Sequence, residues 1–218
     1  MIVIVNCKAF EKGIGLNAVK LAKVCERVAR KERTAIAIAV QHADISRVAS
    51  AVKIPVLAQH VDAIEYGAHT GWVLPESVQS AGAVGSLINH SELGVPPEMI
   101  KKIVQRLRSL GMISVVCAAN PVEEEHLAKF KPDMVAIEPP ELIGGKVSVS
   151  QAKPEVISES VRRVKGVPVL CGAGVHTQED VRKAVELGAQ GILVASGVVN
   201  AKDPEKVLTE LMRGLSRN

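Results

Sequence analysis

The sequence predicts an α/β fold, a closed (β/α)8 barrel of eight parallel strands ringed by helices. Three observations support this prediction. Short aliphatic runs alternate with longer segments of helical period, eight such pairs recur at fairly even spacing along the 218 residues, and no Pro/Ser-rich linker divides them. We therefore expect one domain spanning residues 1–218. An open doubly wound sheet is the alternative, but it usually has fewer strands in one domain.

The expected strands are short apolar runs. Hydrophobic residues make up 47% of the chain but aromatic residues only 2%, so Val, Ile, Leu and Ala must form the core. Such runs suit strands buried on both faces, as in a parallel sheet covered by helices. In chain order the strands are expected at residues 2–5, 35–40, 56–58, 84–88, 113–117, 134–137, 167–171 and 191–195.

Helices are expected between these strands, at residues 16–31, 45–51, 76–81, 97–110, 123–129, 153–164, 178–187 and 204–215. Pro97 suits the first turn of a helix, and Thr177 resembles an N-cap before an acidic first turn. Gly111 and Gly188 lie where helices should end, because glycine readily adopts the left-handed conformation of a C-cap.

Composition excludes several classes of function. The formal net charge of +4 and the pI near 8.9 suit an anionic small molecule, but no basic stretch with interleaved aromatics suggests nucleic acid. The N-terminus lacks the features of a signal peptide, and no apolar run approaches the length of a membrane span. The cysteines form no C-x-x-C or Cys/His cluster, which indicates reduced buried thiols, no metal site and a cytoplasmic protein; they are Cys7, Cys25, Cys117 and Cys171.

The polar residues after the apolar runs are the candidates for function, because the loops after the strands of such a barrel form its active face. Asn6 and Lys8 follow the first run, and strand alternation places them on the same side. His90 follows the fourth run, and an imidazole there can donate a hydrogen bond or act as acid and base. Each of these residues alone is more often a solvated or hydrogen-bonded residue without a function.

Glu138 ends the sixth apolar run and is followed by Pro139, Pro140 and a glycine pair at 144–145. Proline biases the residue before it toward the extended form, and glycine permits close approach of a ligand. An isolated E-P-P is more often an ordinary turn. At a strand end of a barrel, this segment predicts a positioned base and a loop, residues 139–147, that closes over it.

Small residues follow the last two apolar runs, at 172–174 and 195–197. Loops after strands seven and eight of a barrel frequently bind phosphate, through exposed backbone N–H groups. With Lys8, His90 and Glu138 on the same rim, they predict proton transfer next to the carbonyl of a phosphorylated substrate.

Five motifs, in the right order along nearly the whole chain, resemble the triosephosphate isomerase family and most closely its short archaeal form. They are N-x-K at 6–8, I-N-H-S-E at 88–92, E-P-P-E-L-I-G at 138–144, C-G-A-G at 171–174 and L-V-A-S-G at 193–197. The resemblance implies a TIM-barrel isomerase that interconverts dihydroxyacetone phosphate and D-glyceraldehyde 3-phosphate through an enediolate, in glycolysis and gluconeogenesis. It implies no metal and no organic cofactor.

The resemblance also implies a role for each strand-end residue. Glu138 is implied to be the base that moves the proton between two substrate carbons. His90, held neutral near a helix N-terminus, is implied to polarise the carbonyl and move protons among the oxygens. Lys8 is implied to stabilise the enediolate, Asn6 to orient the substrate, and Glu92 to hold Lys8.

The implied phosphate site consists of backbone near the cavity mouth. It is formed around Ile143, Gly144, Gly174, Ala195 and Ser196. Residues 139–147 are implied to be a lid that keeps water from the enediolate phosphate, which could otherwise eliminate phosphate.

Self-association is implied as well. In the family the loop around Thr70 reaches into a neighbouring subunit and supports Asn6 and Lys8, so a homodimer or a homotetramer is expected. Trp72, the only tryptophan, fits burial at such an interface.

Two segments depart from the family pattern. Leu93-Gly94 stands where a basic pair is usual, and Gly145-Lys146 changes the far hinge of the lid. Two other functions are also considered. One is a different phosphate-binding barrel enzyme, such as a synthase of the tryptophan or thiamine pathway. The other is a non-catalytic barrel, which would be expected to have lost Lys8, His90 or Glu138.

Overall fold

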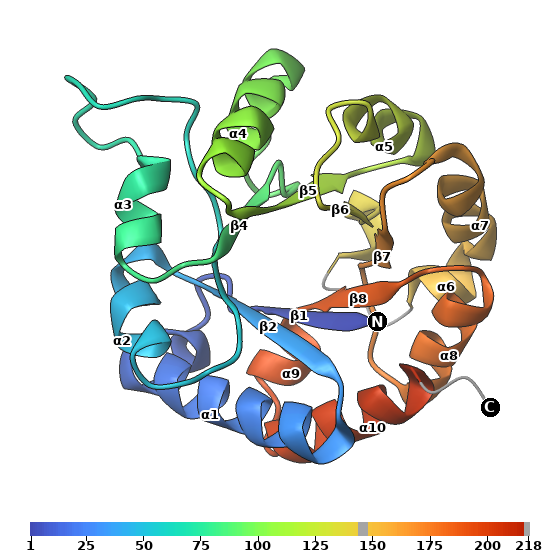
Figure 1. The fold of residues 1–218 in the computed structure, drawn as a ribbon. Helices are drawn as coiled ribbons and strands as arrows, with labels where there is room; N and C mark the ends of the chain where they lie inside the picture. Colours follow the sequence, from blue (N-terminus) through green and yellow to red (C-terminus); the bar gives the residue numbers. More distant parts are fainter. Residues whose placement is uncertain (144–147, 216–218) are drawn as a thin grey trace.

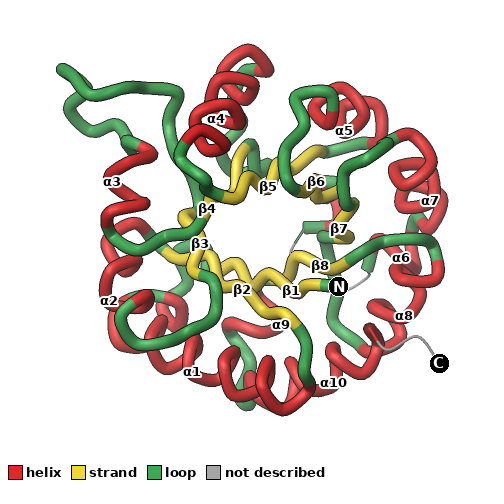
Figure 2. The backbone as a smooth tube through the Cα atoms, in the orientation of Figure 1, coloured by secondary structure: helices red, strands yellow, loops and turns green. Residues whose placement is uncertain are grey.

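The computed structural model describes residues 1–143 and 148–215, and in it the strands close into a parallel barrel in the order β1 to β8. Figure 1 and Figure 2 look into the ring of strands, with the helices around it. The predicted fold class is confirmed. The strands are β1 (Ile2–Asn6), β2 (Ala35–Val40), β3 (Val56–Ala58), β4 (Gly85–Ile88), β5 (Ile113–Ala118), β6 (Met134–Ile137), β7 (Val169–Cys171) and β8 (Gly191–Val194).

The barrel closes at Ile2, which pairs with Ala35 on β2 and with Gly191 on β8. Gly191 is required at this seam, because a Cβ there would lie 2.9 Å from the Leu170 side chain and closer still to the Ile2 carbonyl. Alternation along the strands then divides the core into two parts. Alternate residues fill the inside of the barrel, and their neighbours pack outward against the helices; the inward set is Ile4, Ala37, Ala39, Leu57, Leu87, Val115, Cys117, Ala136, Leu170 and Leu193.

The longer helices lie close to their expected positions, and their termini show why. Thr177 and Asp180 form a complete capping box, and Asp203 accepts a hydrogen bond from the Lys206 amide at the start of the last helix. The helices are α1 (Gly15–Glu32), α2 (Ile45–Ala49), α3 (Pro75–Ser80), α4 (Pro97–Ser109), α5 (Pro121–Ala128), α7 (Pro154–Arg163), α8 (Gln178–Glu186) and α10 (Pro204–Leu215).

Two single-turn helices and three 3₁₀ turns were not predicted. The helices, α6 (Val149–Ala152) and α9 (Ser196–Val199), follow the sixth and eighth strands, and η3 (Pro140–Leu142) is a 3₁₀ turn shortly after Glu138. Two further 3₁₀ turns are η1 (Glu11–Gly13) and η2 (His42–Asp44). Each is a single turn, which is too short to show a helical period in the sequence.

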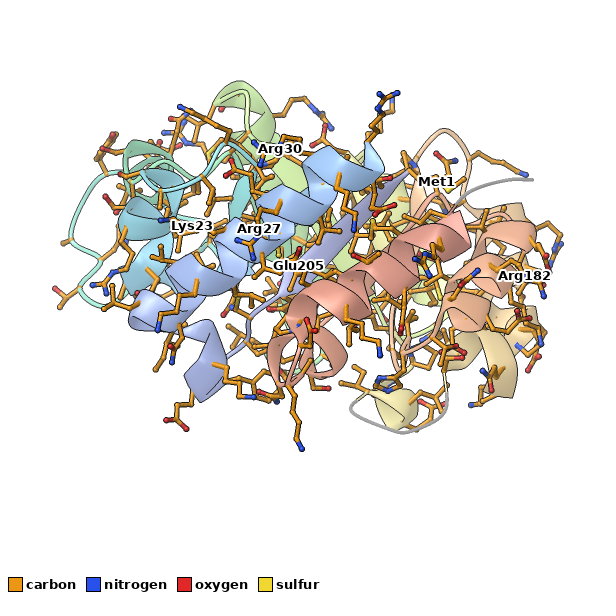
Figure 3. The ribbon with its side chains drawn as sticks, turned by 90° about the horizontal axis from the view of Figure 1, so that it is seen from below. Met1, Lys23, Arg27, Arg30, Arg182 and Glu205 are labelled. Carbon is orange, nitrogen blue, oxygen red and sulfur yellow. The ribbon has the colours of Figure 1, made fainter. Side chains whose placement is uncertain are left out.

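The first and last long helices meet on the outer ring. In Figure 3, α1 and α10 lie side by side, and Arg27 of α1 points to Glu205 of α10. The Arg27 Nη2 and Glu205 Oε2 atoms are 2.8 Å apart, in an ion pair that is about half exposed. Such a surface pair contributes little stability, and the buried apolar residues of α1 and α10, which belong to one core cluster, contribute more to their packing.

A long loop between β3 and α3, residues 59–74, projects from the barrel (Figure 1). Tyr66 and Trp72 on it are 75% and 58% exposed in the single chain. Asp62 holds the base of the loop, because it accepts the Val73 amide at 2.7 Å and its own amide donates to the Val73 carbonyl at 2.9 Å. Among the described residues, no helix is both long enough and apolar enough to cross a membrane.

Glu124 lies on α5, which packs against α7, and it is fully buried. Within the described part of the chain, neither of its carboxylate oxygens has a hydrogen-bond partner. Burial raises its pKa to about 7. Because the folded pKa lies above the ordinary value, the folded state binds more protons between these two values, and stability falls as the pH rises through this interval.

Replacing Glu124 by Gln is therefore expected to raise the free energy of unfolding at pH 8, by at most about 3 kcal/mol, and to raise it less at pH 5. Chemical denaturation at both pH values measures the difference. The control is Glu210→Gln on the exposed face of α10, which should change neither value by more than about 0.5 kcal/mol. An equal effect of Glu124→Gln at the two pH values would contradict the prediction.

Candidate active site

The predicted strand-end residues meet at one cavity of about 310 Å³ at the carboxyl end of the barrel. It is lined by side chains from the ends of β1, β4 and β6 and by loops after β6, β7 and β8. The predicted residues among its lining are Asn6, Lys8, His90, Glu92, Glu138, Ile143, Gly174, Ala195 and Ser196.

Strand alternation delivers Asn6 and Glu138 to this cavity. Ile4 and Ala136 point into the barrel, so Asn6 and Glu138, two residues further along, point inward at its mouth. Lys8 lies beyond the end of β1, so the alternation expected from the sequence does not direct it. Its φ is 47°, and this left-handed turn shortly after β1 sends the ammonium into the cavity.

The left-handed conformation of Lys8 costs free energy in a residue with a side chain, and hydrogen bonds from three strand ends hold it. The Lys8 amide donates to Asn6 Oδ1 at 3.0 Å. Its carbonyl accepts from Gln41 Nε2 and Gln59 Nε2, both at 3.1 Å. The Lys8 ammonium, in turn, lies 2.7 Å from Glu92 Oε1, as the resemblance implied.

His90 also owes its direction to a left-handed residue. Leu87 points into the barrel, and the φ of 60° at Asn89 breaks the alternation, so that His90 faces the cavity. The Glu92 amide donates to His90 Nδ1 at 3.2 Å. Because Nδ1 is an acceptor, the proton of the neutral ring must lie on Nε2.

The cause of His90 neutrality differs from the expected one. The residues that follow His90 form a turn, and α4 begins only at Pro97, so this segment does not give His90 a helix N-terminus. Burial lowers the pKa of His90 first, and the nearby Lys8 charge lowers it further, while Glu92 opposes them. The imidazole is therefore neutral around pH 7.

The segment with the unusual Leu93-Gly94 is held through Asn89. The Asn89 side-chain amide accepts from Val95 N at 2.9 Å and donates to the Cys117 carbonyl and to Glu123 Oε1, at 3.0 and 3.2 Å. Leu93 itself is 55% exposed. A neutral amide thus fixes the turn after His90 in a chain that lacks the usual basic pair.

Glu138 is a buried carboxylate with the pKa of a base that works near neutrality. Burial raises its pKa to about 7, and Lys8, the Cys117 thiol and the Ala173 amide partly offset that effect. The Cys117 thiol stays protonated, because burial and the Glu138 charge raise its own pKa. The protonated Cys117 thiol can therefore donate a hydrogen bond to the carboxylate, as the Ala173 amide can.

Glu138 Oε2 and His90 Nε2 face each other across 3.5 Å. Both atoms are buried, and within the described residues neither has a hydrogen-bond partner. Buried polar atoms are almost always paired, so an unpaired acceptor and an unpaired donor in one cavity indicate a place for a polar ligand.

Gly172 makes room for the base. It follows the inward Leu170 by two residues, and a Cβ there would lie 2.8 Å from Glu138 Oε1 and closer to its Cγ. We expect Gly172→Ala to displace the carboxylate and to lower kcat about 100-fold, because a shift of about 1 Å at a reacting group has this effect. Steady-state kinetics measure it.

The matched control is Gly94→Ala, whose Cβ would meet nothing closer than Asn89 Oδ1 at 4.0 Å. This variant should keep kcat within about twofold of the wild type, since a surface change away from the chemistry has small effects. A Gly172→Ala protein that is folded and as active as the wild type would show that Glu138 need not occupy the observed position.

The other side of the cavity is backbone of the last two strand loops. Ala173 and Gly174 have φ of 63° and 67°, and Ala195 is the N-cap of α9. The first N–H groups of a helix have no partner inside the helix, and they can bind an anion. Ile143 completes this wall, whereas Gly144 and the hinge at Gly145 and Lys146 lie outside the described residues.

Thr70 is the predicted residue that does not reach the cavity, because it lies on the projecting loop between β3 and α3. The sequence reasoning missed three residues that support the site, Gln41, Gln59 and Cys117, and it did not predict that Gly172 makes room for Glu138. The two glutamines directly follow β2 and β3, so the strand-end rule that found His90 would also have found them. In the described part of the chain, no group of three or more His, Cys, Asp or Glu side chains has the geometry to hold a metal ion.

Comparisons with known proteins give the family of this chain. The family model of triosephosphate isomerase matches residues 1–213. A triosephosphate isomerase of Methanothermus fervidus is 49% identical and one of Archaeoglobus fulgidus is 47% identical; the alignments cover 97% of this chain and 97% and 96% of those proteins. A crystal structure of the triosephosphate isomerase of Bartonella henselae has the same fold, with a TM-score of 0.73 at 17% identity over 98% of this chain and 96% of that one. The chain belongs to the triosephosphate isomerase family.

Proposed function

We propose that this protein interconverts dihydroxyacetone phosphate and D-glyceraldehyde 3-phosphate, with Glu138 as the base and His90 as the electrophile. The observation that carries the proposal is the pair of unpartnered buried atoms, Glu138 Oε2 and His90 Nε2, which face each other beside the Lys8 ammonium within the described residues. A cavity of about 310 Å³ lies at the small end of ligand sites and suits a triose phosphate better than the larger substrates of other phosphate-binding barrels.

In this mechanism Glu138 removes a proton from C1 of dihydroxyacetone phosphate. The C–H electron pair forms the C1–C2 double bond, and the carbonyl pair moves to O2. His90 Nε2–H gives its proton to O2 and takes the proton of the O1 hydroxyl. Glu138 then returns the first proton to C2, and C1 becomes the aldehyde carbon. The reaction is redox-neutral, so electrons balance within the substrate and no cofactor has to accept them.

Fixed charge stabilises the enediolate. Lys8 is held by Glu92 and by the hydrogen bonds to its backbone, so it needs little rearrangement when charge develops on the substrate oxygens. Asn6 lies beside it and orients the substrate. The neutral His90 is a better partner than a cation here, because it can both give and take a proton without leaving a large charge imbalance.

The substrate phosphate binds to backbone of the loops after β7 and β8, around Gly174, Ala195 and Ser196, with Ile143 on a further side. The predicted role of the segment that begins at Pro139 is to limit contact of the phosphate with water; its residue Gly144 lies outside the described residues. The buried free cysteines fit work in the cytoplasm, in the glycolytic and gluconeogenic use of triose phosphates.

A coupled spectrophotometric assay with glyceraldehyde 3-phosphate tests the reaction, and calorimetry with 2-phosphoglycolate tests the site. We expect turnover without an added cofactor and competitive binding of 2-phosphoglycolate, whose carboxylate resembles the enediolate. The control ligand is glycolate, which lacks the phosphate and should bind far more weakly. A purified, folded protein with neither turnover nor affinity for 2-phosphoglycolate would refute the proposal.

We also propose that the chain forms a homodimer, as a unit or as half of a tetramer, through the loop at residues 59–74. The support is the exposed Tyr66 and Trp72 on this projecting loop, together with Thr70 between them. In such a dimer the loop of one copy supports Asn6 and Lys8 of the other. Sedimentation of the wild type and of Trp72→Glu tests this, since a monomeric wild type would exclude it.

A further inference from the structure

We propose that Asp180 is a positioning residue for the isomerase site, and that it acts by fixing the turn between β7 and α8, residues 172–177. The inference rests on the proposed function, and it concerns a residue outside the cavity lining. Asp180 belongs to α8 and is 2% exposed. It joins the turn to α6 through both of its carboxylate oxygens.

The turn between β7 and α8 lies beside both the phosphate side of the cavity and the base Glu138. Gly174 and its neighbours line the phosphate side of the cavity. On the other side, the Ala173 amide lowers the pKa of the Glu138 carboxyl. A small movement of the turn would therefore change the phosphate site and the base together.

This turn is also strained. Ala173 and Gly174 adopt consecutive left-handed conformations, with φ of 63° and 67°. The conformation at Ala173 is unfavourable for a residue with a Cβ, and it persists only where the surroundings fix it. One restraint is the Val149 amide of α6, which donates to the Ala173 carbonyl at 3.2 Å.

Asp180 supplies two further restraints. Its Oδ2 accepts the amides of His176 and Thr177, at 3.0 and 2.9 Å. A helix cap requires only the second of these bonds, and the first one fixes the cavity-lining residue His176. The carboxylate thus shapes the turn as well as the start of α8.

The second oxygen of Asp180 faces α6. Its Oδ1 accepts the Ser148 hydroxyl at 2.7 Å and the Gln151 side-chain amide, and the Asp180 carbonyl accepts the Ser150 hydroxyl at 3.0 Å. The Ser148 hydroxyl and the amides of His176 and Thr177 lower the pKa of Asp180 despite its burial. The charge is therefore retained near neutrality, and one residue ties α6 to the turn.

Asp203 provides a matched comparison. It also caps a helix, since its Oδ1 accepts the Lys206 amide at 3.0 Å, but it is exposed and does not line the cavity. A variant at Asp203 removes a cap alone. A variant at Asp180 removes a cap and the restraint on the turn.

The experiment compares Asp180→Asn and Asp203→Asn in the complete protein, well below their melting temperatures. The amide introduced by Asp180→Asn accepts through one oxygen only, so it cannot serve all four donors. We expect this variant to raise KM for glyceraldehyde 3-phosphate at least tenfold and to lower the affinity for 2-phosphoglycolate by a similar factor. Its kcat/KM should also rise at a higher pH than in the wild type, because a displaced Ala173 amide lowers the pKa of Glu138 less. Asp203→Asn should change melting temperature without these kinetic effects.

The result that overturns the inference is a folded Asp180→Asn protein with wild-type KM, affinity and pH profile. If Asp180→Asn does not fold, the variants Ser148→Ala and Gln151→Ala test the inference instead, since each removes one donor to Asp180 Oδ1. Either should raise KM about threefold, and wild-type kinetics in both would overturn the inference. Failure of the proposed function looks different, because the wild type itself would then show no turnover.

Discussion

Replacing Glu138 by Gln is expected to lower kcat by roughly 10³- to 10⁴-fold, at the upper end of the range for loss of a general base. The upper end is expected because Glu92, the other carboxylate of the cavity lining, is ion-paired with Lys8 and cannot take over. Glutamine has nearly the same shape and keeps the packing against Gly172. The loss therefore reports the chemistry of the carboxylate and not a rearranged site.

The same residue sets the pH profile of the wild type. With a pKa raised to about 7 by burial, Glu138 is protonated and inactive below this value. We expect kcat/KM to rise with pH through about 7 and then to level off. The pKa of His90 is lowered, so this residue remains neutral over the same interval and adds no second step there.

Steady-state kinetics of Glu138→Gln and Glu138→Asp check the assignment. The aspartate keeps the charge but withdraws the carboxylate by one methylene, which should cost about 100-fold. The free energy of unfolding at pH 8 is an independent measurement, since Glu138→Gln removes a buried charge and should be more stable than the wild type. Undiminished turnover in Glu138→Gln would remove Glu138 from its role as the base.

Replacing Lys8 by Met has the second largest expected effect, a loss of roughly 10²- to 10³-fold in kcat, as for removal of an oxyanion-stabilising donor. Methionine fills similar space without the charge. KM should increase as well, because the ammonium is a cation in the cavity that receives an anionic substrate.

The Lys8 variant should also shift the pH profile. The Lys8 charge lowers the pKa of both Glu138 and His90. Without it, both pKa values rise, so the rise of kcat/KM should move to higher pH. The control is Lys23→Met on the exposed face of α1 (Figure 3), which removes an equal charge away from the cavity. An unmoved profile in Lys8→Met would show that Lys8 does not act on Glu138 electrostatically.

Much of the fold and the main site residues could be predicted because they follow from local rules. Eight aliphatic runs at even spacing predict a barrel, and a polar residue at the end of a run lies at its mouth. Glu138 obeys this rule directly, since it continues the inward alternation of Ala136. The prediction for Lys8 reached the right place for a different physical reason, because a left-handed φ and not strand alternation directs it.

What could not be predicted depends on partners distant in sequence. Gln41 and Gln59 could have been placed at strand ends from the sequence, but their shared partner, the Lys8 carbonyl, becomes apparent only in the folded chain. Cys117 resembles the other buried cysteines, and only the register of β5 against β6 places it beside Glu138. The neutrality of His90 was expected from a helix N-terminus, whereas burial, Lys8 and the Glu92 amide produce it.

The two carboxylates with a pKa near 7 set opposite preferences for this protein. Glu138 must be ionised for turnover, and in both Glu124 and Glu138 the ionised form carries a net cost of burial. The turnover rate is therefore higher in alkaline solution, while the free energy of unfolding is higher in slightly acidic solution. Glu124→Gln should raise the melting temperature at the pH of maximal activity and leave kcat unchanged.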